Sequence, residues 1–282
     1  MEKKLLNKIV CGNSAKEMRR ISEESVSLTV TSPPYDDLRN YNNIVSDNLE
    51  YYNGYSFPFE PIADHLYRVT QPGGVVVWVV GDAVIKGGET GSSFRQALYF
   101  MNLGFKLHDT MIYEKNGCAF PARRDGNRYS QIFEYMFVFS KKTKPRYANL
   151  ISDKPNRWAG YTHFGKGTVR NKNGELIERN IKPIPEYSPR NNIWKYVTGK
   201  NYSTKDKIAF EHPAIFPEQL AEDHILTWSK EGDTVLDPFA GSGTTCKMAK
   251  ANNRNYIGIE ADERYCEISK KRVALVSNKK KE

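Results

Sequence analysis

The sequence has 282 residues, enough to bury a hydrophobic core as one large domain or as a core domain with an inserted lobe. Hydrophobic residues make up 39% of it and aromatic residues 12%, values typical of a globular protein, which argues against disorder. No apolar stretch approaches the roughly 18 residues of a membrane span, and the first residues lack the apolar region of a signal peptide. We therefore expect a cytosolic protein without a membrane anchor.

The first 140 residues alternate between patterns typical of strands and of helices. Strands are expected at 8–11, 26–30, 75–80, 106–113 and 134–140, and helices at 14–21, 59–69 and 93–103. Ser14 is the expected cap of the first helix, with Glu17 three residues further on. The second strand ends at a double proline.

The periodicity disappears between residues 141 and 210, where Pro, Gly, Asn and basic residues are interleaved with aromatic ones. This segment holds 16 Lys and Arg against 5 Asp and Glu, so it carries more than the whole net charge of +9. Such a concentration of positive charge suits contact with nucleic-acid phosphates, although a solvated surface loop is the alternative. We expect Trp158 and Trp194 to anchor a small core within it.

The regular pattern returns after residue 211, with helices expected at 218–228, 244–251 and 262–276 and strands at 234–236 and 256–259. Strands that alternate with helices at this spacing predict a parallel α/β sheet. We divide the chain into a first core half at 1–140, an insertion at 141–210, a second core half at 211–276 and a basic tail at 277–282.

The four cysteines are scattered without a C-x-x-C pair, and the five histidines do not cluster with acidic residues. We therefore expect reduced cysteines and no metal site. The cysteines are Cys11, Cys118, Cys246 and Cys266.

A strand, a glycine-rich turn and a helix start follow one another in Thr-Val-Leu-Asp-Pro-Phe-Ala-Gly-Ser-Gly-Thr-Thr, residues 234–245. Gly241 and Gly243 let the backbone approach a ligand closely. Glu260 ends the next strand, where Rossmann-like sites place a carboxylate that binds ribose hydroxyls. The pattern thus predicts a nucleoside-containing ligand, with a plain strand-to-helix turn as the alternative.

Two phosphate-containing ligands fit this turn poorly. A phosphate-binding loop needs a Lys after its last glycine, and none follows Gly243. A dinucleotide-binding turn has a third glycine where this sequence has Cys246, and Asp237 would repel a phosphate. S-adenosylmethionine fits better, because it has a ribose and a cationic amino group but no phosphate.

Ser32-Pro33-Pro34-Tyr35 stands at the carboxyl end of an expected strand, where open α/β sheets bind their ligands. The amine of a base such as cytosine is a poor nucleophile, because its lone pair is conjugated into the ring. The Ser32 side chain and the Pro33 carbonyl can accept hydrogen bonds from that amine, and the prolines preset the backbone. Tyr35 offers an aromatic face to a base turned out of the duplex. An ordinary tight turn is the alternative.

The motifs occur in the order T-S-P-P-Y, E-Y-M-F-V-F-S, H-P-A-I-F-P-E, D-P-F-A-G-S-G-T-T and G-I-E-A-D-E. This order resembles the permuted, β-class S-adenosylmethionine-dependent DNA amino-methyltransferases of bacterial restriction-modification systems, over about residues 8–140 and 210–273. The resemblance implies an α/β fold: a Rossmann-like methyltransferase sheet, mostly parallel with an antiparallel edge strand, and an inserted irregular target-recognition lobe.

The resemblance also implies roles for individual residues. The catalytic residues would be Ser32, Pro33, Pro34 and Tyr35. The cofactor-binding residues would be Asp237, Phe239, Gly241, Ser242, Gly243, Thr244 and Glu260, with Phe216 and Pro217 on the methionine side and Asn13 near the adenine.

The resemblance implies that the partner is double-stranded DNA. It also implies a cognate restriction endonuclease that acts separately, and a homodimer. Serine in place of the aspartate of D-P-P-Y resembles the cytosine-N4 members. Either side chain can accept the hydrogen bond, so adenine N6 stays open, and so does an RNA or protein amine. The candidate DNA-binding residues are Arg123, Arg124, Arg128, Arg157, Lys166 and Arg170.

Overall fold

The computed structural model describes residues 5–34, 57–117, 128–162, 168–178 and 182–276. The chain forms two compact units, one of residues 1–149 and 192–282 and the other of residues 150–191. The second unit is shorter than the insertion expected at 141–210. It contains two small antiparallel pairs, β8 (Ser152–Pro155) with β11 (Tyr187–Pro189) and β9 (Thr168–Arg170) with β10 (Leu176–Glu178).

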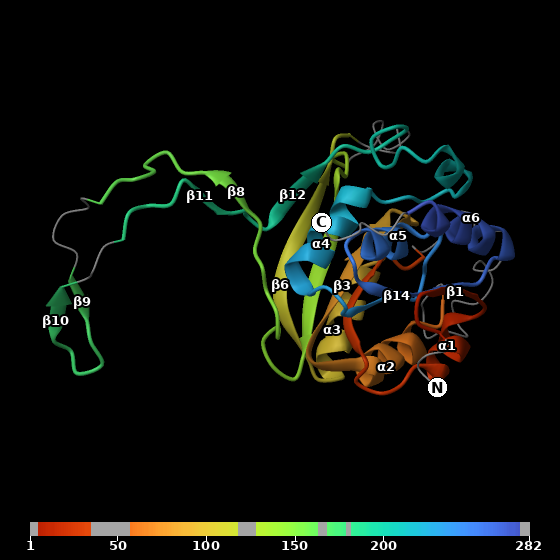
Figure 1. Cartoon of the computed structure of the whole chain (residues 1–282), viewed down its shortest axis with the longest axis horizontal. Coiled ribbons are helices and arrows are strands. Elements are labelled where there is room, and N and C mark those ends of the chain that lie inside the picture. The colour runs from red at the N-terminus through yellow and green to blue at the C-terminus, as the bar shows by residue number, and fades with distance from the viewer. Residues whose placement is uncertain (1–4, 35–56, 118–127, 163–167, 179–181, 277–282) are drawn as a thin grey trace. The chain divides into compact units, whose positions relative to one another are not determined.

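An eight-stranded sheet forms the centre of the first unit, in the order β1-β14-β13-β2-β3-β7-β6-β12 (Figure 1). Neighbouring strands are parallel except that β7 runs antiparallel to both β3 and β6. The strands are β1 (Lys8–Cys11), β2 (Val26–Thr31), β3 (Thr70–Val80), β6 (Phe105–Lys115), β7 (Phe133–Lys141), β12 (Ile193–Tyr196), β13 (Thr234–Asp237) and β14 (Asn255–Glu260). A separate short hairpin joins β4 (Val84–Ile85) to β5 (Gly88–Glu89).

Two groups of helices pack against this sheet. One group is α1 (Ser14–Glu17), which continues as a 3₁₀ turn (Met18–Arg20), α2 (Phe59–Val69) and α3 (Ser92–Asn102). The other is α4 (Glu218–Trp228), α5 (Thr244–Ala251) and α6 (Glu263–Ala274), with a 3₁₀ turn (Lys207–Glu211) against α6. All six residues of β2 are buried, as expected of a parallel strand covered on both faces.

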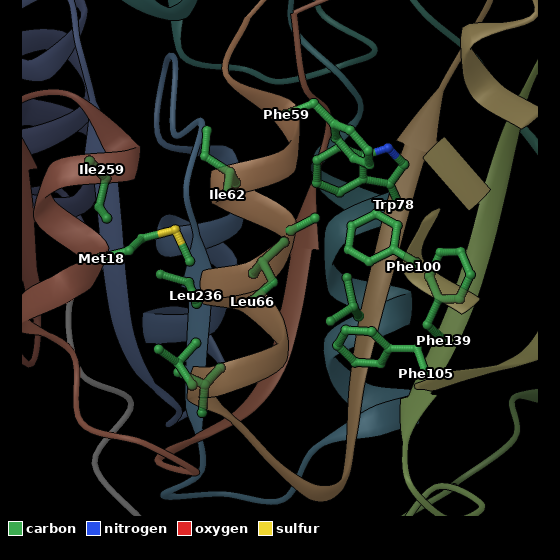
Figure 2. Packing of buried hydrophobic residues seen from close by; sticks show 14 of the residues in the cluster. Met18, Phe59, Ile62, Leu66, Trp78, Phe100, Phe105, Phe139, Leu236 and Ile259 are labelled. Carbon is green, nitrogen blue, oxygen red and sulfur yellow. The ribbon is translucent and has the colours of Figure 1, made fainter. Parts of the chain in front are cut away.

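Aromatic side chains dominate the core between α2, α3 and the sheet (Figure 2). The Trp78 ring of β3 lies 5.9 Å from Phe59 of α2 and 5.1 Å from Phe100 of α3, measured between ring centroids. Phe100 in turn lies 4.9 Å from Phe139 of β7. The Trp78 indole N–H donates to Gln96 at 2.8 Å, so the one polar atom of this ring is satisfied within the core.

The structure confirms the expected α/β class and differs in local details. The antiparallel strand β7 lies inside the sheet, because β6 and then β12 add beyond it. Asn13, rather than Ser14, caps α1: its side chain accepts from the Lys16 amide at 3.3 Å, while the Ser14 hydroxyl donates to the Pro238 carbonyl.

Both tryptophans expected in a small core of the insertion are placed otherwise. Trp158 is 57% exposed and has the Arg157 guanidinium over its ring. Trp194 is buried, but in β12 of the main sheet, where its ring lies 4.7 Å from that of His224 in α4. The two tryptophans therefore do not form a shared core in the second unit.

The expectation of reduced cysteines is wrong for one pair. Cys11 ends β1 and Cys266 lies in α6, which packs against β1, and the structure joins the two in a disulfide with their Cα atoms 5.8 Å apart. Cys246 is buried and free. The separation of 255 residues hides this proximity from any local sequence pattern.

Candidate active site at the carboxyl edge of the sheet

A cavity of about 270 Å³ opens at the carboxyl edge of the sheet in the first unit. The chain leaves β2 toward β3 on one side, and it leaves β13 toward β14 on the other, so the strand order reverses between β13 and β2. Open α/β sheets bind ligands at such a switch point. The cavity lies there, between the loop after β2 and the turn after β13.

The turn after β13 forms the part of the cavity where the sequence predicts the cofactor, which we call the cofactor half. Gly241 and Gly243 both have positive φ angles, 51° and 80°. A Cβ atom on Gly243 would lie 2.2 Å from the Ser269 Oγ of α6, and one on Gly241 would lie 2.9 Å from the His212 Nε2. The two glycines are therefore required both by the backbone conformation and by the close approach of neighbouring elements.

Glu260 ends β14 directly beside this turn. Its carboxylate accepts from the Gly241 amide at 2.7 Å and from the Asp262 amide at 3.0 Å. Burial raises the pKa of the Glu260 carboxyl, and the two amide donors oppose that rise. Glu260 lines the cavity, so a carboxylate with a fixed orientation faces the ligand space.

The predicted cofactor residues fall into two groups. Asn13, Phe216, Phe239, Gly241, Ser242, Thr244 and Glu260 line the cavity. Asp237, Gly243 and Pro217 are not among the lining residues. Pro217 directly precedes α4, and Gly243 directly precedes α5.

Asp237 has a different environment from the one the sequence suggested. We expected its carboxylate to meet the amino group of the ligand. Instead the side chain is buried, accepts from the Thr31 hydroxyl at 2.7 Å and accepts from the Phe239 amide at 3.1 Å. Burial raises the pKa of Asp237 to about 6. The carboxylate thus joins the end of β2 to the turn after β13 without lining the cavity.

The loop after β2 forms the other half. Ser32, Pro33 and Pro34 all line the cavity, with Pro33 buried and Ser32 partly exposed. Tyr35 lies outside the described residues. The serine and the first proline therefore face the same space as Glu260, although more than 200 residues separate them in sequence.

Sequence analysis missed several residues of this cavity. Tyr113 and Lys115 come from the end of β6 and Glu134 from the start of β7, so they lie at the same edge of the sheet as Ser32. Their position at the ends of two strands joined by one loop is the sequence feature that could have identified them. The lining residues that the sequence did not predict also include Phe57, Ile62, Thr198, His212, Asp262 and Tyr265.

A buried arginine supports the glycine turn from outside the cavity. The Arg272 guanidinium of α6 donates to the Ser242 carbonyl at 2.7 Å and to the Thr244 hydroxyl at 3.1 Å. It also pairs with Asp206 at 3.0 Å and with Glu218 at 2.6 Å. The sequence predicted a helix at 262–276 but gave no role to Arg272.

The donor set of the cofactor half suits S-adenosylmethionine. Among the lining residues that the structure describes, Lys115 alone carries a permanent positive charge, and it is paired with Glu134 on the far wall. The glycine turn instead faces the carboxylates of Glu260 and Asp262 and the ring of Phe239. Carboxylates, an aromatic face and closely approaching glycines fit a cationic nucleoside without phosphate.

The candidate DNA-binding residues are only partly described. Arg123, Arg124 and Lys166 lie outside the described residues. Arg128 pairs with Glu89 at 3.8 Å. In the second unit, the Arg157 guanidinium lies 5.4 Å from the Trp158 ring and Arg170 donates to the Gly174 carbonyl at 2.8 Å.

The described part of the chain contains neither a cluster of metal-binding side chains nor a helix that could span a membrane. No group of three or more histidines, cysteines and carboxylates is placed to hold a metal ion. No helix is long and apolar enough to span a membrane.

The fold and the cavity together define a Rossmann-like methyltransferase. A family profile described as DNA methylase, for N6 and N4 methyltransferases, matches residues 26–271, and the chain belongs to this family. It is a DNA amino-methyltransferase of the restriction-modification type, and its cofactor is S-adenosylmethionine.

Individual relatives agree with this assignment. The chain is 58% identical over 254 residues to the orphan methyltransferase M.BamHII of Bacillus amyloliquefaciens, covering 90% of each protein. It is 28% identical to the type II methyltransferase M.BglII of Bacillus subtilis, covering 95% of this chain and 69% of the relative.

Solved structures share the fold. PvuII DNA methyltransferase, described as cytosine-N4-specific, matches 97% of this chain and 87% of its own, with a TM-score of 0.66 and 22% identity. A complex of M1.HpyAVI with S-adenosylmethionine matches 95% of this chain and 99% of its own, with a TM-score of 0.56 and 20% identity.

Proposed function

We propose that the protein methylates the N4 amine of cytosine within a short sequence of duplex DNA. The observation that carries this proposal is the position of Ser32 and Pro33 on the same cavity as the cofactor turn. PvuII methyltransferase is described as cytosine-N4-specific, but at 22% identity the likeness establishes only the fold and does not assign the target base. The choice of base therefore rests on serine at position 32.

Ser32 and Pro33 act on the amine through hydrogen bonds. The Ser32 Oγ and the Pro33 carbonyl oxygen accept from the two amine hydrogens, which favours a pyramidal nitrogen with its lone pair freed from the ring. When bound, S-adenosylmethionine supplies an electrophilic methyl group. With the cofactor bound, the freed lone pair would bond to its methyl group as the methyl–sulfur bond breaks and S-adenosylhomocysteine leaves, and the methylated amine would release one proton to water.

The residues of the cofactor half have roles in the same proposal. Glu260 binds the ribose hydroxyls, Asn13 lies near the adenine, Phe216 lines the methionine side, and Phe239 contacts the cofactor. The Gly241 and Asp262 amides donate to different oxygens of the Glu260 carboxylate, so Glu260→Gln leaves one of them facing an NH2 group. Cofactor affinity should fall by about 10-fold or more, as expected for loss of a charged hydrogen-bond acceptor.

Two further expectations stay open beside this proposal, and a third loses support. DNA contacts by Arg128, Arg157 and Arg170 and self-association as a homodimer stay predictions. A dedicated endonuclease is disfavoured, because the relative at 58% identity is described as an orphan methyltransferase.

Nucleoside mass spectrometry tests the proposal on DNA from methylation-deficient bacteria that express the protein. We expect N4-methylcytosine. N6-methyladenine in its place would show that the base assignment is wrong, and the absence of both would contradict DNA amine methylation altogether.

Two variants at one position separate the role of Ser32 from simple packing. Ser32→Ala removes the acceptor and should lower the rate by about 100-fold or more, in line with loss of one preorganised hydrogen-bonding group. Ser32→Asp keeps an acceptor and should retain more activity than Ser32→Ala. Equal activity of Ser32→Ala and the unaltered protein would refute the role.

A further inference from the structure

An ion pair lies on the wall of the cavity that β6 and β7 form. The Lys115 ammonium contacts the Glu134 carboxylate, and their side chains are only 19% and 10% exposed. Both residues line the cavity. The Lys115 amide donates to the Ile132 carbonyl at 2.7 Å, which fixes the backbone of β6 beside the start of β7.

The fold does not require a charged pair at this place. Removing two charges from water costs free energy, and an apolar pair of similar volume is often as stable or more stable. The same strand β6 also has an exposed pair, Glu114 with Lys195 of β12 at 2.8 Å, where the lysine side chain is 65% exposed and stays hydrated. A pair buried on a cavity wall therefore points to a ligand.

The position of the pair separates it from the cofactor half. Along the sheet the order is β14, β13, β2, β3, β7, β6. Glu260 ends β14, Ser32 follows β2, and Lys115 ends β6. The pair thus lies on the far side of Ser32 from the carboxylate of the cofactor half, where the substrate base has to lie.

We propose that Lys115 recognises the ring of the target cytosine. This inference rests on the proposed function. Cytosine presents its N4 amine, ring N3 and O2 side by side on one edge. An ammonium has three N–H donors. With Glu134 holding one of them, Lys115 donates to N3 and O2 while Ser32 and Pro33 accept from the amine.

This arrangement selects between the two bases. Adenine also has a ring nitrogen acceptor beside its amine, but it has a C–H group where cytosine has O2. A site built to donate to a substrate acceptor discriminates against an analogue that lacks it. Glu134 balances the charge of Lys115, so the wall does not draw electrons from the amine as an isolated cation would.

Tyr113 is a positioning residue for this lysine. Its ring lies two residues before Lys115 on β6, is 2% exposed, and has the Lys115 Nζ 5.8 Å from its centroid. The ring also packs edge-on against Tyr196 of β12 at 5.8 Å. These contacts limit the directions in which the ammonium can point.

The test combines a variant with an altered substrate. Methyl transfer is measured for the full-length protein and for Lys115→Met, on duplexes that carry either cytosine or 3-deazacytosine at the target position. 3-Deazacytosine keeps the amine and O2 but lacks the N3 acceptor. The unaltered protein should lose about 10- to 100-fold in kcat/KM on the analogue, the range for a hydrogen bond to a charged group.

Lys115→Met should lose at least this factor on cytosine, because the hydrogen bonds to N3 and to O2 are both gone. The variant should then methylate cytosine and 3-deazacytosine at nearly equal rates, because it has no donor left that could distinguish N3 from a C–H group. Losses that multiply independently would overturn the inference, and so would an unchanged rate with cytosine. The matched control is Lys195→Met, which breaks the exposed Lys–Glu pair and should leave the rate unchanged.

Two further measurements keep the outcome clear. Cofactor affinity, measured by calorimetry, should change by less than about 2-fold in Lys115→Met, since the ion pair lies away from the cofactor half. If Lys115→Met does not fold, the double variant Lys115→Met with Glu134→Leu supplies an apolar pair for the same assay. The base methylated by the unaltered protein is identified first by mass spectrometry. Methylated adenine contradicts the proposed function, whereas methylated cytosine with independent losses contradicts only the role of Lys115.

Discussion

The Thr31 hydroxyl donates a 2.7 Å hydrogen bond to the carboxylate of Asp237, across 206 residues of sequence. Thr31 is the last residue of β2 and precedes Ser32, while Asp237 is the last residue of β13 and precedes the cofactor turn. A second bond, from the Thr245 hydroxyl to the Val30 carbonyl at 3.0 Å, joins the same two segments. The two halves of the active site are therefore positioned against each other by buried hydrogen bonds at the switch point of the sheet.

Replacing Thr31 by Val should destabilise the protein and weaken cofactor binding together. The variant keeps the shape of the side chain but leaves the buried Asp237 carboxylate without one donor, which costs about 1–3 kcal/mol. Urea unfolding and calorimetric titration with S-adenosylmethionine measure the two effects.

Thr29→Val is the matched control on the same strand. Thr29 is buried, and its hydroxyl has no hydrogen-bond partner among the described residues. Its replacement should therefore be neutral or slightly stabilising. A Thr31→Val variant that behaves like Thr29→Val would show that the bond to Asp237 contributes nothing.

Asp237 should make the stability of the folded protein fall as the pH rises toward neutrality. Burial raises its pKa to about 6, above the ordinary value of 3.8 for an aspartate. The folded state therefore binds the proton more tightly than the unfolded state does. This contribution to stability is complete below about pH 3.8 and is lost as the pH rises through about 6.

The comparison with Asp237→Asn isolates that effect, because the amide does not titrate. Between pH 5 and pH 7.5 the unfolding free energy of the unaltered protein should fall by about 1 kcal/mol relative to that of the variant. Denaturant unfolding at several pH values provides the measurement. A constant difference between the two proteins over this range would contradict a raised pKa.

Most of the regular elements could be predicted from the sequence, because their hydrophobic periodicity is local. The helix expected at 59–69 is α2 with the same bounds, and the helices at 218–228 and 244–251 are α4 and α5. The strand β12 was missed, since its four residues have little periodicity and lie in a segment dominated by basic and polar residues. Its place at the sheet edge depends on pairing with β6, which no local pattern contains.

The residues of the active site that belong to one contiguous motif could be predicted from the sequence. Those that come together only through the pairing of distant strands could not. The glycine turn and the Ser-Pro-Pro loop are each contiguous in sequence, so a local motif was enough to predict that both lie at the cavity. The environment of Asp237 could not be predicted in this way, because its hydrogen-bond partner Thr31 belongs to a strand 206 residues away. Lys115 and Glu134 belong to two strands that become neighbours only in the folded sheet.

Replacing Gly243 by Ala should abolish cofactor binding and destabilise the fold. The residue has a φ angle of 80°, and a Cβ would lie 2.2 Å from the Ser269 Oγ and 3.0 Å from the Ser269 Cα. The backbone atom cannot move aside as a flexible side chain would. Calorimetric titration and thermal unfolding measure the two losses.

Gly174→Ala is the control for backbone strain alone. Gly174 has a φ angle of 83°, but a Cβ there would meet nothing within 4 Å. The control should lose about 1–2 kcal/mol from the left-handed conformation and leave cofactor binding unchanged. Equal losses in the two variants would mean that the approach of α6 to the turn has no energetic consequence.

Arg272 should be required for the conformation of the cofactor turn. Its guanidinium is fully buried and reaches the Ser242 carbonyl, while Asp206 and Glu218 balance its charge. Arg272→Met removes the donors and leaves the two partly buried carboxylates with Lys247 as their remaining cationic partner among the ion pairs described. Breaking a buried pair in this way costs about 3–5 kcal/mol.

The cofactor should therefore bind more weakly to Arg272→Met even at temperatures where the variant is folded, because the Ser242 carbonyl loses its donor. Arg264→Met tests the same helix at an exposed pair with Glu211 and should change neither stability nor binding appreciably. Calorimetric titrations of both variants at 15 °C, with folding verified by circular dichroism, separate the two effects. A folded Arg272→Met protein with unchanged cofactor affinity would restrict the arginine to a role in stability and exclude one in shaping the turn.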